Sequence, residues 1–324
     1  MKNLPELFKK QKVLIVGDVM VDRYLLGQVN RMSPEAPVPV VDFEKEDNRL
    51  GGAANVALNI AALGAEPILL SVIGKDAEGK LFRRLLKKHK LTPKGILIDT
   101  DRPTTLKTRV MAANQHLLRI DRENKNDLPK SVEKALTEKA KRILSKGDIS
   151  VVLFQDYNKG VLTKKLIQFI AKLARKKNIP TVVDPKFDRF FEYKKVDLFK
   201  PNLKEVKQVV PFPVSIDLES LIAAADFIEK KLNHSMTMIT LSEHGIFIKK
   251  GKLAKIIPTA TRKIADVCGA GDAVISVAAL GLAGTLPIAM IAKLSNDAGG
   301  KVCEKVGVVP VTIEDLMLAI SNWS

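Results

Sequence analysis

The sequence predicts an α/β protein with a mostly parallel β-sheet covered by helices. Short continuous apolar runs recur along the chain, and such runs are typical of strands that are buried on both faces. Helix-like segments separate these runs, and this alternation favours right-handed βαβ units. No internal repeat or linker divides the sequence, so we expect a single domain over residues 1–324. The predicted strands are residues 13–16, 68–73, 149–154, 181–183 and 236–241, and the predicted helices are residues 53–63, 79–89, 132–144, 164–177 and 218–232.

Two segments interrupt this alternation. Residues 25–48 contain Pro34, Pro37 and Pro39, which are unfavourable in a crossover helix. Residues 96–121 carry alternating apolar and polar side chains, as a half-buried strand does. We expect both segments to form a small separate β-sheet that acts as a lid over a cleft, as a dimerisation surface, or as both.

Residues 273–292 form an uncharged run that is close to the length needed to span a bilayer. Gly281, Gly284 and Pro287 cluster within it, where one buried helix would end and a second would begin. Asp272 stands just before the run, in the position of an acid at a helix start. We therefore expect buried helices and no membrane span.

The formal net charge of +17 raises the question of a nucleic-acid partner. The basic residues lie mostly on helix-like stretches such as residues 80–90 and 172–177, whereas residues 266–324 are acidic. Charge of this kind is usually found on solvent-exposed helix faces, and aromatic residues for base stacking are few. We expect an acidic small-molecule substrate and no nucleic acid.

The cysteine content indicates a reducing compartment. Cys268 and Cys303 are the only cysteines, too few for a disulfide framework. Residues 1–12 contain no apolar stretch of the kind found in secretory signals. We expect a cytoplasmic protein.

Residues 266–272 read Asp-Val-Cys-Gly-Ala-Gly-Asp and precede the long apolar run. The glycines leave backbone N–H groups bare at a helix N-terminus, which is a ready anion site. Asp272 adds a carboxylate that can take a proton from a hydroxyl attacking a phosphate. The combination favours phosphoryl transfer, and the alternative is a glycine turn with an acid in the first helical turn. This segment alone leaves both interpretations open.

Other polar groups stand beside the predicted strands and helices. Gly51 and Gly52 allow a ligand to approach the backbone closely, and Asn55 can both donate and accept. Asn202 and Glu205 have the spacing of a helix capping box. Ligands bind at the carboxyl ends of parallel strands, although any one carboxylate there can also serve a turn. The carboxylates in question are Asp18, Asp22, Asp156 and Asp184.

Together these motifs resemble the ribokinase-like (pfkB) sugar kinases over nearly the whole chain, and most of all the heptose 7-phosphate kinases among them. The Gly-Ala-Gly-Asp motif at residues 269–272 is shared by that family. The Ser-Pro-Glu-Ala-Pro-Val-Pro-Val run at residues 33–40 and the Asp-Tyr-Asn-Lys-Gly motif at residues 156–160 are more specific to the heptose branch. The remaining matching motifs are residues 17–24, 51–57, 114–115, 184–186 and 201–205.

The resemblance implies a three-layer α/β/α core with a β-lid and a kinase that uses ATP and Mg²⁺, with a monovalent cation as a further candidate. The implied reaction phosphorylates the anomeric hydroxyl of D-glycero-β-D-manno-heptose 7-phosphate, giving the 1,7-bisphosphate for ADP-heptose and lipopolysaccharide core synthesis. One alternative is a related kinase acting on ribose, fructose 1-phosphate or a keto-deoxy sugar acid. Another is a non-catalytic protein that binds sugar phosphates or nucleic acid. The expected partners are ATP, a sugar phosphate and a second copy that pairs through the lid.

The resemblance also assigns roles to residues. It implies that Asp272 is the catalytic base and that the backbone of Gly269, Ala270 and Gly271 forms the anion hole. Glu205 would hold magnesium through water. The nucleotide-binding candidates are Asn202, Leu203, Lys204, Glu205, Ser242, Glu243, Gly245 and Asn296. The substrate-binding candidates are Asp18, Asp22, Gly51, Gly52, Asn55, Arg109, Asn114, Asp156, Lys159, Asp184 and Lys186, of which the three cations are expected to bind the substrate phosphate.

The chain also departs from the family pattern. Cys268 stands where heptose kinases usually have Thr or Ser, Gln155 replaces a common Ser, and Ala273 replaces a common Thr. A thiol beside helix-terminal amides should have a lowered pKa and raised reactivity; the alternative is a small buried replacement for Thr. Bifunctional relatives continue into a nucleotidyltransferase domain with a His-x-Gly-His motif. That motif is absent from these 324 residues, so we expect either a stand-alone kinase or the kinase part of a longer protein.

Overall fold

The computed structural model describes residues 3–113, 115–260, 264–305 and 307–323, and a nine-stranded sheet lies at its centre. The strand order is β13-β12-β11-β10-β9-β8-β1-β4-β5. Strand β12 runs antiparallel to both of its neighbours and the other pairs run parallel, which confirms the predicted, mostly parallel sheet. The strands are β1 (Lys12–Gly17), β4 (Glu66–Gly74), β5 (Ile96–Asp99), β8 (Val151–Gln155), β9 (Thr181–Asp184), β10 (Leu198–Phe199), β11 (Met236–Thr240), β12 (Ile246–Lys250) and β13 (Leu253–Ile257).

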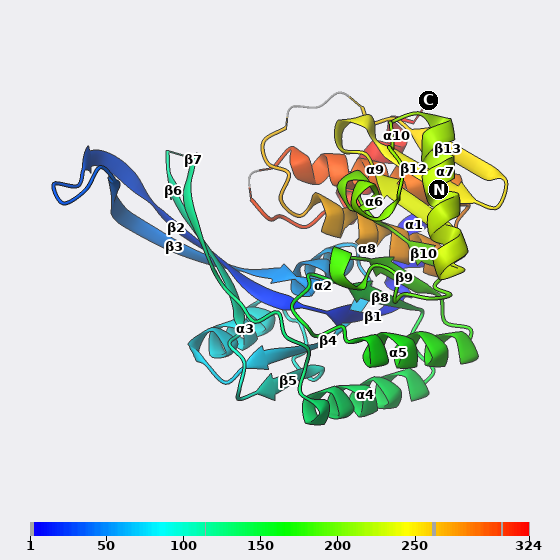
Figure 1. Ribbon diagram of the computed structural model, residues 1–324, viewed down its shortest axis with the longest axis horizontal. Helices are drawn as coiled ribbons and strands as arrows, with labels where there is room; N and C mark the ends of the chain where they lie inside the picture. The colour runs from blue at the N-terminus through cyan, green and yellow to red at the C-terminus, as the bar shows by residue number, and fades with distance from the viewer. Residues whose placement is uncertain (1–2, 114, 261–263, 306, 324) are drawn as a thin grey trace.

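Helices cover both faces of this sheet, giving three layers (Figure 1). Along β1, Val13 and Ile15 enter one apolar core while Leu14 and Val16 enter the other, because successive side chains of a strand point to opposite faces. Both faces are therefore apolar, which explains the continuous apolar runs. The first core packs against α1 (Leu4–Lys9), α2 (Ala53–Ala62), α3 (Ala77–Lys88), α8 (Ala270–Ala283), α9 (Ile288–Cys303) and α10 (Ile313–Ser321), and the second against α4 (Lys130–Ser145), α5 (Lys164–Lys176), α6 (Leu203–Val209) and α7 (Leu218–Leu232).

A second sheet projects from the body, and we call it the lid (Figure 1). Its strand order is β3-β2-β6-β7, with β2 antiparallel to β3 and parallel to β6. The predicted segment 96–121 begins too early, because β5 pairs in parallel with β4 at the edge of the main sheet. The short apolar run of β5 extends that edge, and the lid strand begins only after it. The lid strands are β2 (Val19–Met32), β3 (Pro39–Gly52), β6 (Thr105–Ala112) and β7 (Gln115–Arg122).

The long uncharged run is divided between two helices, as predicted. Gly284 caps the C-terminus of α8, and Pro287 is the residue before α9. Nine consecutive residues of α8, from Ala273 to Gly281, are buried, which accounts for their lack of charge. Within the described ranges, none of the helices is both long and apolar enough to span a membrane.

Candidate active site

A cavity of about 690 Å³ opens at the carboxyl ends of the central strands. Its walls come from the residues that follow β8, β9, β10 and β11, and from the first turn of α8 together with one face of α9. This is the edge of a parallel sheet where ligands bind, because the loops there converge on one crevice. Of the four predicted carboxylates, Asp18, Asp156 and Asp184 lie at the ends of main-sheet strands, and Asp22 lies within β2. Asp184 is the one of the four that lines the cavity.

The loop before α8 forms one wall of the cavity. Gly269 has φ +83°, a left-handed conformation that favours glycine, and it is the N-cap of the helix. A Cβ atom there would lie 3.2 Å from the side-chain nitrogen of Asn55. Gly269, Ala270 and Gly271 all line the cavity, and they lie at the N-terminus of α8, where the helix dipole is positive.

Asp272 lies at the inner end of this wall, and its carboxylate accepts three hydrogen bonds. Asn55 Nδ2 donates to Oδ2 at 2.6 Å, the Tyr157 hydroxyl donates to Oδ1 at 2.7 Å, and Gln155 Nε2 donates to Oδ1 at 3.2 Å. Burial raises the pKa of Asp272 to about 6, against the lowering effect of the bonds from Asn55 and Tyr157. A carboxylate with this pKa can act as a general base near neutral pH.

A second buried carboxylate, Asp184, lies beside the base. Its Oδ2 atom accepts from the same Gln155 Nε2 at 3.2 Å and forms an ion pair with Lys200 Nζ at 3.1 Å. Both Asp184 and Lys200 are buried and line the cavity. Gln155 therefore bridges two carboxylates, and one buried lysine offsets part of their negative charge.

The predicted nucleotide-binding residues follow strands β10 and β11, apart from Asn296 on α9. Asn202 and Glu205 form a complete capping box at the start of α6, and Glu205 also pairs with Lys186. Asn202 and Lys186 line the cavity. Glu205 does not line it, but it contacts Lys186, which does. Leu203 and Lys204 are not among its lining residues. The other candidates that line it are Ser242, Glu243, Gly245 and Asn296.

The predicted sugar-binding residues near the lid form a connected group. Asp22 on β2 pairs with Arg109 on β6 at 2.5 Å. A Cβ atom on Gly51 would lie 1.9 Å from Asp22 Oδ2, so the glycine permits this carboxylate to sit against β3. Gly52 has φ +61° and is the N-cap of α2, the helix that carries Asn55 to the base. The candidate Asn114 lies outside the described residues.

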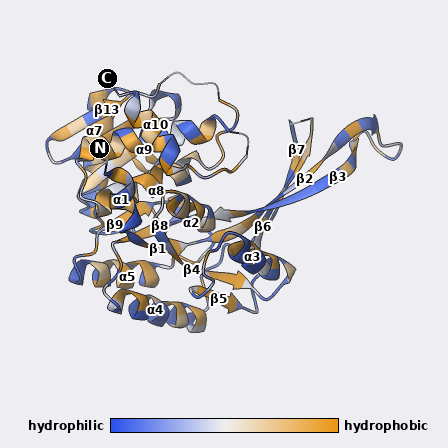
Figure 2. Cartoon of the chain, turned by 180° about the vertical axis from the view of Figure 1, so that it is seen from behind, coloured by the Kyte–Doolittle hydropathy of each residue, from blue (hydrophilic) through white to orange (hydrophobic). Residues whose placement is uncertain are grey.

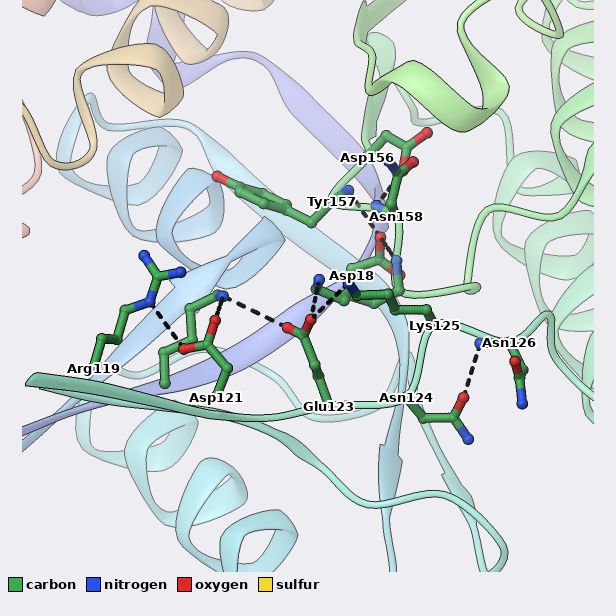
Figure 3. Close-up of polar contacts among 12 residues, drawn as sticks. Asp18, Arg119, Asp121, Glu123, Asn124, Lys125, Asn126, Asp156, Tyr157 and Asn158 are labelled. Carbon is green, nitrogen blue, oxygen red and sulfur yellow. Dashed lines mark hydrogen bonds and ion pairs between the residues drawn. The ribbon is translucent and has the colours of Figure 1, made fainter.

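Three substrate candidates are occupied elsewhere. The Asp18 carboxylate accepts backbone N–H bonds from the 157–161 loop, and that of Asp156 accepts the Tyr193 hydroxyl at 2.6 Å. Lys159 Nζ pairs with Glu123 at 2.8 Å, in the cluster shown in Figure 3. None of the three is among the residues that line the main cavity. Their contacts hold the loop in place instead.

The expected lowering of the Cys268 pKa is wrong. Burial, followed by the thiol's hydrogen bond and repulsion from Asp266, raises the pKa of Cys268 to about 11. The Asp266 carboxylate already accepts the Cys268 backbone N–H at 2.9 Å, so a negative charge is held beside the sulfur. Burial and the neighbouring carboxylate both disfavour the thiolate, so the position beside the helix terminus does not make this thiol acidic.

Three residues of the site escaped sequence reasoning as functional groups: Gln155, Tyr157 and Lys200. Tyr157 belongs to the quoted Asp-Tyr-Asn-Lys-Gly motif, which was a usable signal. Gln155 was visible only as a replacement for Ser. Lys200 stands two residues before Asn202, but its pairing with Asp184 depends on the neighbouring strands β9 and β10.

Comparisons with known proteins agree with this architecture. Residues 10–315 match the family described as pfkB family carbohydrate kinase. The bifunctional protein HldE of Syntrophotalea carbinolica is 39% identical over 323 residues, which cover 99% of this chain and 65% of the relative. HldE of Helicobacter pylori is 38% identical over 313 residues, covering 96% and 67%. The chain thus spans about two thirds of the length of these curated relatives.

Solved structures show the same fold at low sequence identity. Phosphofructokinase-2 from Escherichia coli, in complex with potassium, has a TM-score of 0.79 and 17% identity, covering 96% of this chain and 98% of its own. Ribokinase from Arabidopsis thaliana, complexed with ribose and ATP, has a TM-score of 0.74 and 16% identity, covering 97% and 99%. The ribokinase-like α/β fold implied by the sequence motifs is confirmed.

Proposed function

The chain belongs to the pfkB family of carbohydrate kinases, and we propose that it transfers the γ-phosphate of ATP to the anomeric hydroxyl of D-glycero-β-D-manno-heptose 7-phosphate. The observation that carries the phosphoryl-transfer chemistry is the placement of Asp272. Its carboxylate lies beside the backbone of Gly269 to Gly271, at the helix end that stabilises negative charge. A base and an anion site in one wall are what transfer to a hydroxyl requires.

The heptose assignment is supported by the sequence. The run at residues 33–40 and the motif at residues 156–160 resemble those of heptose kinases. The relatives named HldE match this chain over nearly its whole length. The product in this proposal is the 1,7-bisphosphate, which would serve ADP-heptose synthesis.

The residues of the cavity fit a nucleotide that arrives with magnesium. Among the described residues, no cluster of three or more His, Cys, Asp or Glu side chains is arranged to hold a metal. Phosphoryl-transfer sites often bind Mg²⁺ by one or two carboxylates together with substrate phosphates and water. Both oxygens of Glu205 already accept, one from Lys186 Nζ and one from the Asn202 N–H, so Glu205 would take such a role through water. When bound, magnesium would neutralise charge on the phosphates. Lys186 and Lys200 line the same cavity and would add positive charge to it.

The protein's own groups account for the proton transfer. In the ionised state Asp272 accepts the proton of the sugar hydroxyl while that oxygen attacks the γ-phosphorus and ADP leaves. The N-terminus of α8 at residues 269–271 would stabilise negative charge on the transferred group, and Asn55 holds the carboxylate in place. Positioning of this kind, together with charge stabilisation, supplies most of the acceleration in phosphoryl transfer.

The experiment that tests the proposal is a substrate panel with ATP. We expect kcat/KM to be highest for heptose 7-phosphate among that sugar, unphosphorylated heptose, ribose, fructose 1-phosphate and a keto-deoxy sugar acid. Phosphorus NMR of the product should place the new phosphate on the anomeric carbon. A higher kcat/KM for another sugar would reject the heptose assignment, and no turnover of any sugar would reject the kinase.

The lid also supports a proposed homodimer. Along β7, Leu118 and Ile120 share one face, because alternate residues of a strand point the same way, and they are 57% and 54% exposed. Figure 2 shows apolar residues on the projecting strands β2 and β3 as well. We expect sedimentation of the wild type to give a dimer and the double variant Leu118→Ser, Ile120→Ser a monomer. Leu318→Ser, an equally exposed position on α10, is the matched control. A monomeric wild type would refute the pairing.

A further inference from the structure

The two oxygens of Asp272 are not equivalent. Oδ1 accepts from the Tyr157 hydroxyl and from Gln155 Nε2, whereas Oδ2 accepts from Asn55 alone among the residues that the structure describes. Each carboxylate oxygen offers two lone-pair positions. Oδ1 is therefore filled by protein donors, and Oδ2 keeps one position for the proton of a substrate hydroxyl.

Tyr157 acts in this arrangement as a donor. Burial and the neighbouring Asp272 and Asp184 carboxylates raise the pKa of Tyr157 well above 10. The phenol therefore keeps its proton throughout the working pH range, and the ionised carboxylate can only accept. The bond is charge-assisted, a class that is shorter and stronger than bonds between neutral groups.

The loop that carries Tyr157 is held at several points. Asp18 Oδ2 accepts the backbone N–H of Tyr157 at 2.9 Å, and Asp18 Oδ1 accepts that of Val161 at 3.1 Å. Lys159, between them, pairs with Glu123 at 2.8 Å. Figure 3 shows Asp18 beside the backbone of this loop and the Tyr157 ring pointing away from Asp18. The hydroxyl is thus presented to Asp272 from a fixed backbone.

We propose that Tyr157 is a positioning residue for the base: its hydroxyl occupies Oδ1 of Asp272, so that Oδ2 receives the proton of the substrate hydroxyl. This inference rests on the proposed function only in taking Asp272 as the base of a kinase. In the transfer, the sugar O–H bond breaks, its proton binds Oδ2, the sugar oxygen bonds to the γ-phosphorus, and ADP departs with the electron pair. Without the Tyr157 hydroxyl, the carboxylate loses both a restraint on rotation and a partner that stabilises its charge.

The pH dependence of kcat reports on this contact. The groups that act electrostatically on Asp272 are Asp184 on β9, Lys200 after β10 and Tyr157 after β8, while Asn55 and Gln155 are neutral donors. Activity should rise with pH as Asp272 ionises, at the pKa of about 6. Removing one donor to the charged form raises that pKa. All the other groups remain, so the change isolates the hydroxyl.

The test compares Tyr157→Phe with Tyr193→Phe by single-turnover kinetics over pH 5 to 9, in the full chain with ATP and the sugar phosphate. The matched control also removes a phenol that donates to a buried carboxylate, here Asp156 at 2.6 Å. The acid limb is the part of the pH profile in which the rate rises as Asp272 ionises. In Tyr157→Phe the midpoint of this limb should move up by about one pH unit, since a hydrogen bond to a charged group is being lost. KM for ATP and for the sugar should stay as in the wild type, and Tyr193→Phe should leave the limb in place.

Substitution of 3-fluorotyrosine at position 157 provides a second test in which the side chain is nearly unchanged. Its more acidic phenol is a stronger donor, so the limb should move down in pH. An acid limb that stays at the wild-type pH in both position-157 variants overturns the inference. An unchanged limb with a raised KM for the sugar also overturns it, because Tyr157 would then contact the substrate and not the base. Full activity of Asp272→Asn would instead reject the base and with it the proposed function.

Discussion

Replacing Asp272 by asparagine should lower the rate of phosphoryl transfer and, at pH 8, raise the free energy of unfolding. In Asp272→Asn the side chain keeps its shape, and its Oδ1 can still accept from Tyr157 and Gln155. The new amide nitrogen would face the Asn55 nitrogen, which lies 2.6 Å from Oδ2 in the wild type. Asn55 can turn its amide, because its own oxygen is buried and no described residue forms a hydrogen bond with it. The variant should therefore keep the contact between the side chains at positions 55 and 272 and lose the base.

The stability change follows from the pKa. Asp272 ionises at about 3.8 when unfolded and at about 6 when folded, so the unfolded chain loses its proton first as the pH rises. Ionisation then destabilises the folded state progressively between these two values and fully above pH 6. Two pKa units at about 1.36 kcal/mol each make this cost about 3 kcal/mol for a group that is only 6% exposed. The substituted amide carries no charge, so the variant should be the more stable protein at pH 8 by up to that amount, and the difference should shrink toward pH 4.

Two measurements check this pair of effects. Urea unfolding at pH 4, 6 and 8 gives the free energy of unfolding of both proteins, and single-turnover kinetics gives the rate of the chemical step. The loss of general-base catalysis should lower that rate by roughly 10²–10⁴, while ATP binding by calorimetry stays intact. A variant less stable than wild type at pH 8, or one that keeps more than a tenth of the rate, would contradict the reasoning.

Three further predictions concern the cavity and its surroundings. Gly51→Ala places a Cβ 1.9 Å from Asp22 Oδ2, so that carboxylate must move. Steady-state kinetics should then show a raised KM for the sugar and an unchanged KM for ATP. Cys268 should react slowly with iodoacetamide at pH 7 and faster as the pH approaches its raised pKa of about 11; rapid labelling followed by mass spectrometry at pH 7 would contradict this. Lys186→Gln should raise KM for ATP about tenfold, the size of one lost hydrogen bond to a charged group, and raise KM for the sugar less; the reverse order would return Lys186 to the sugar side, as the sequence had suggested.

The sequence was sufficient to predict the strands and helices that follow the regular alternation of apolar runs and helix-like segments. Apolar runs such as residues 13–16 are long enough to identify a buried parallel strand, and Pro287 marks the break between α8 and α9. Strand β5 shows the limit of the method. Its few residues are consistent with either sheet, and only the pairing of Ile96 with Ser71 decides between them.

The candidate site was predictable in its motifs and not in its contacts. Asp272 and the glycines before it are recognisable from local pattern, because a helix start is a local structure. Whether Lys159 faces a ligand depends on Glu123, which the lid brings to it and no nearby residue reveals. The pKa of Cys268 likewise depends on burial and on Asp266, and the order of these effects cannot be read from spacing.

The hydrogen bond between Asn55 and Asp272 joins residues that are 217 positions apart in the chain. At about 5–20 residues per second of synthesis, the partner of Asn55 leaves the ribosome roughly 10–40 s after Asn55 itself. Strand β1 is also made well before β8, which flanks it in the finished sheet. The nascent polypeptide therefore passes through a long interval in which α2 exists without α8 and the phosphoryl-transfer centre has no base. A truncated translation product that ends before α8 would lack catalytic power altogether, however much of the sheet it had already formed.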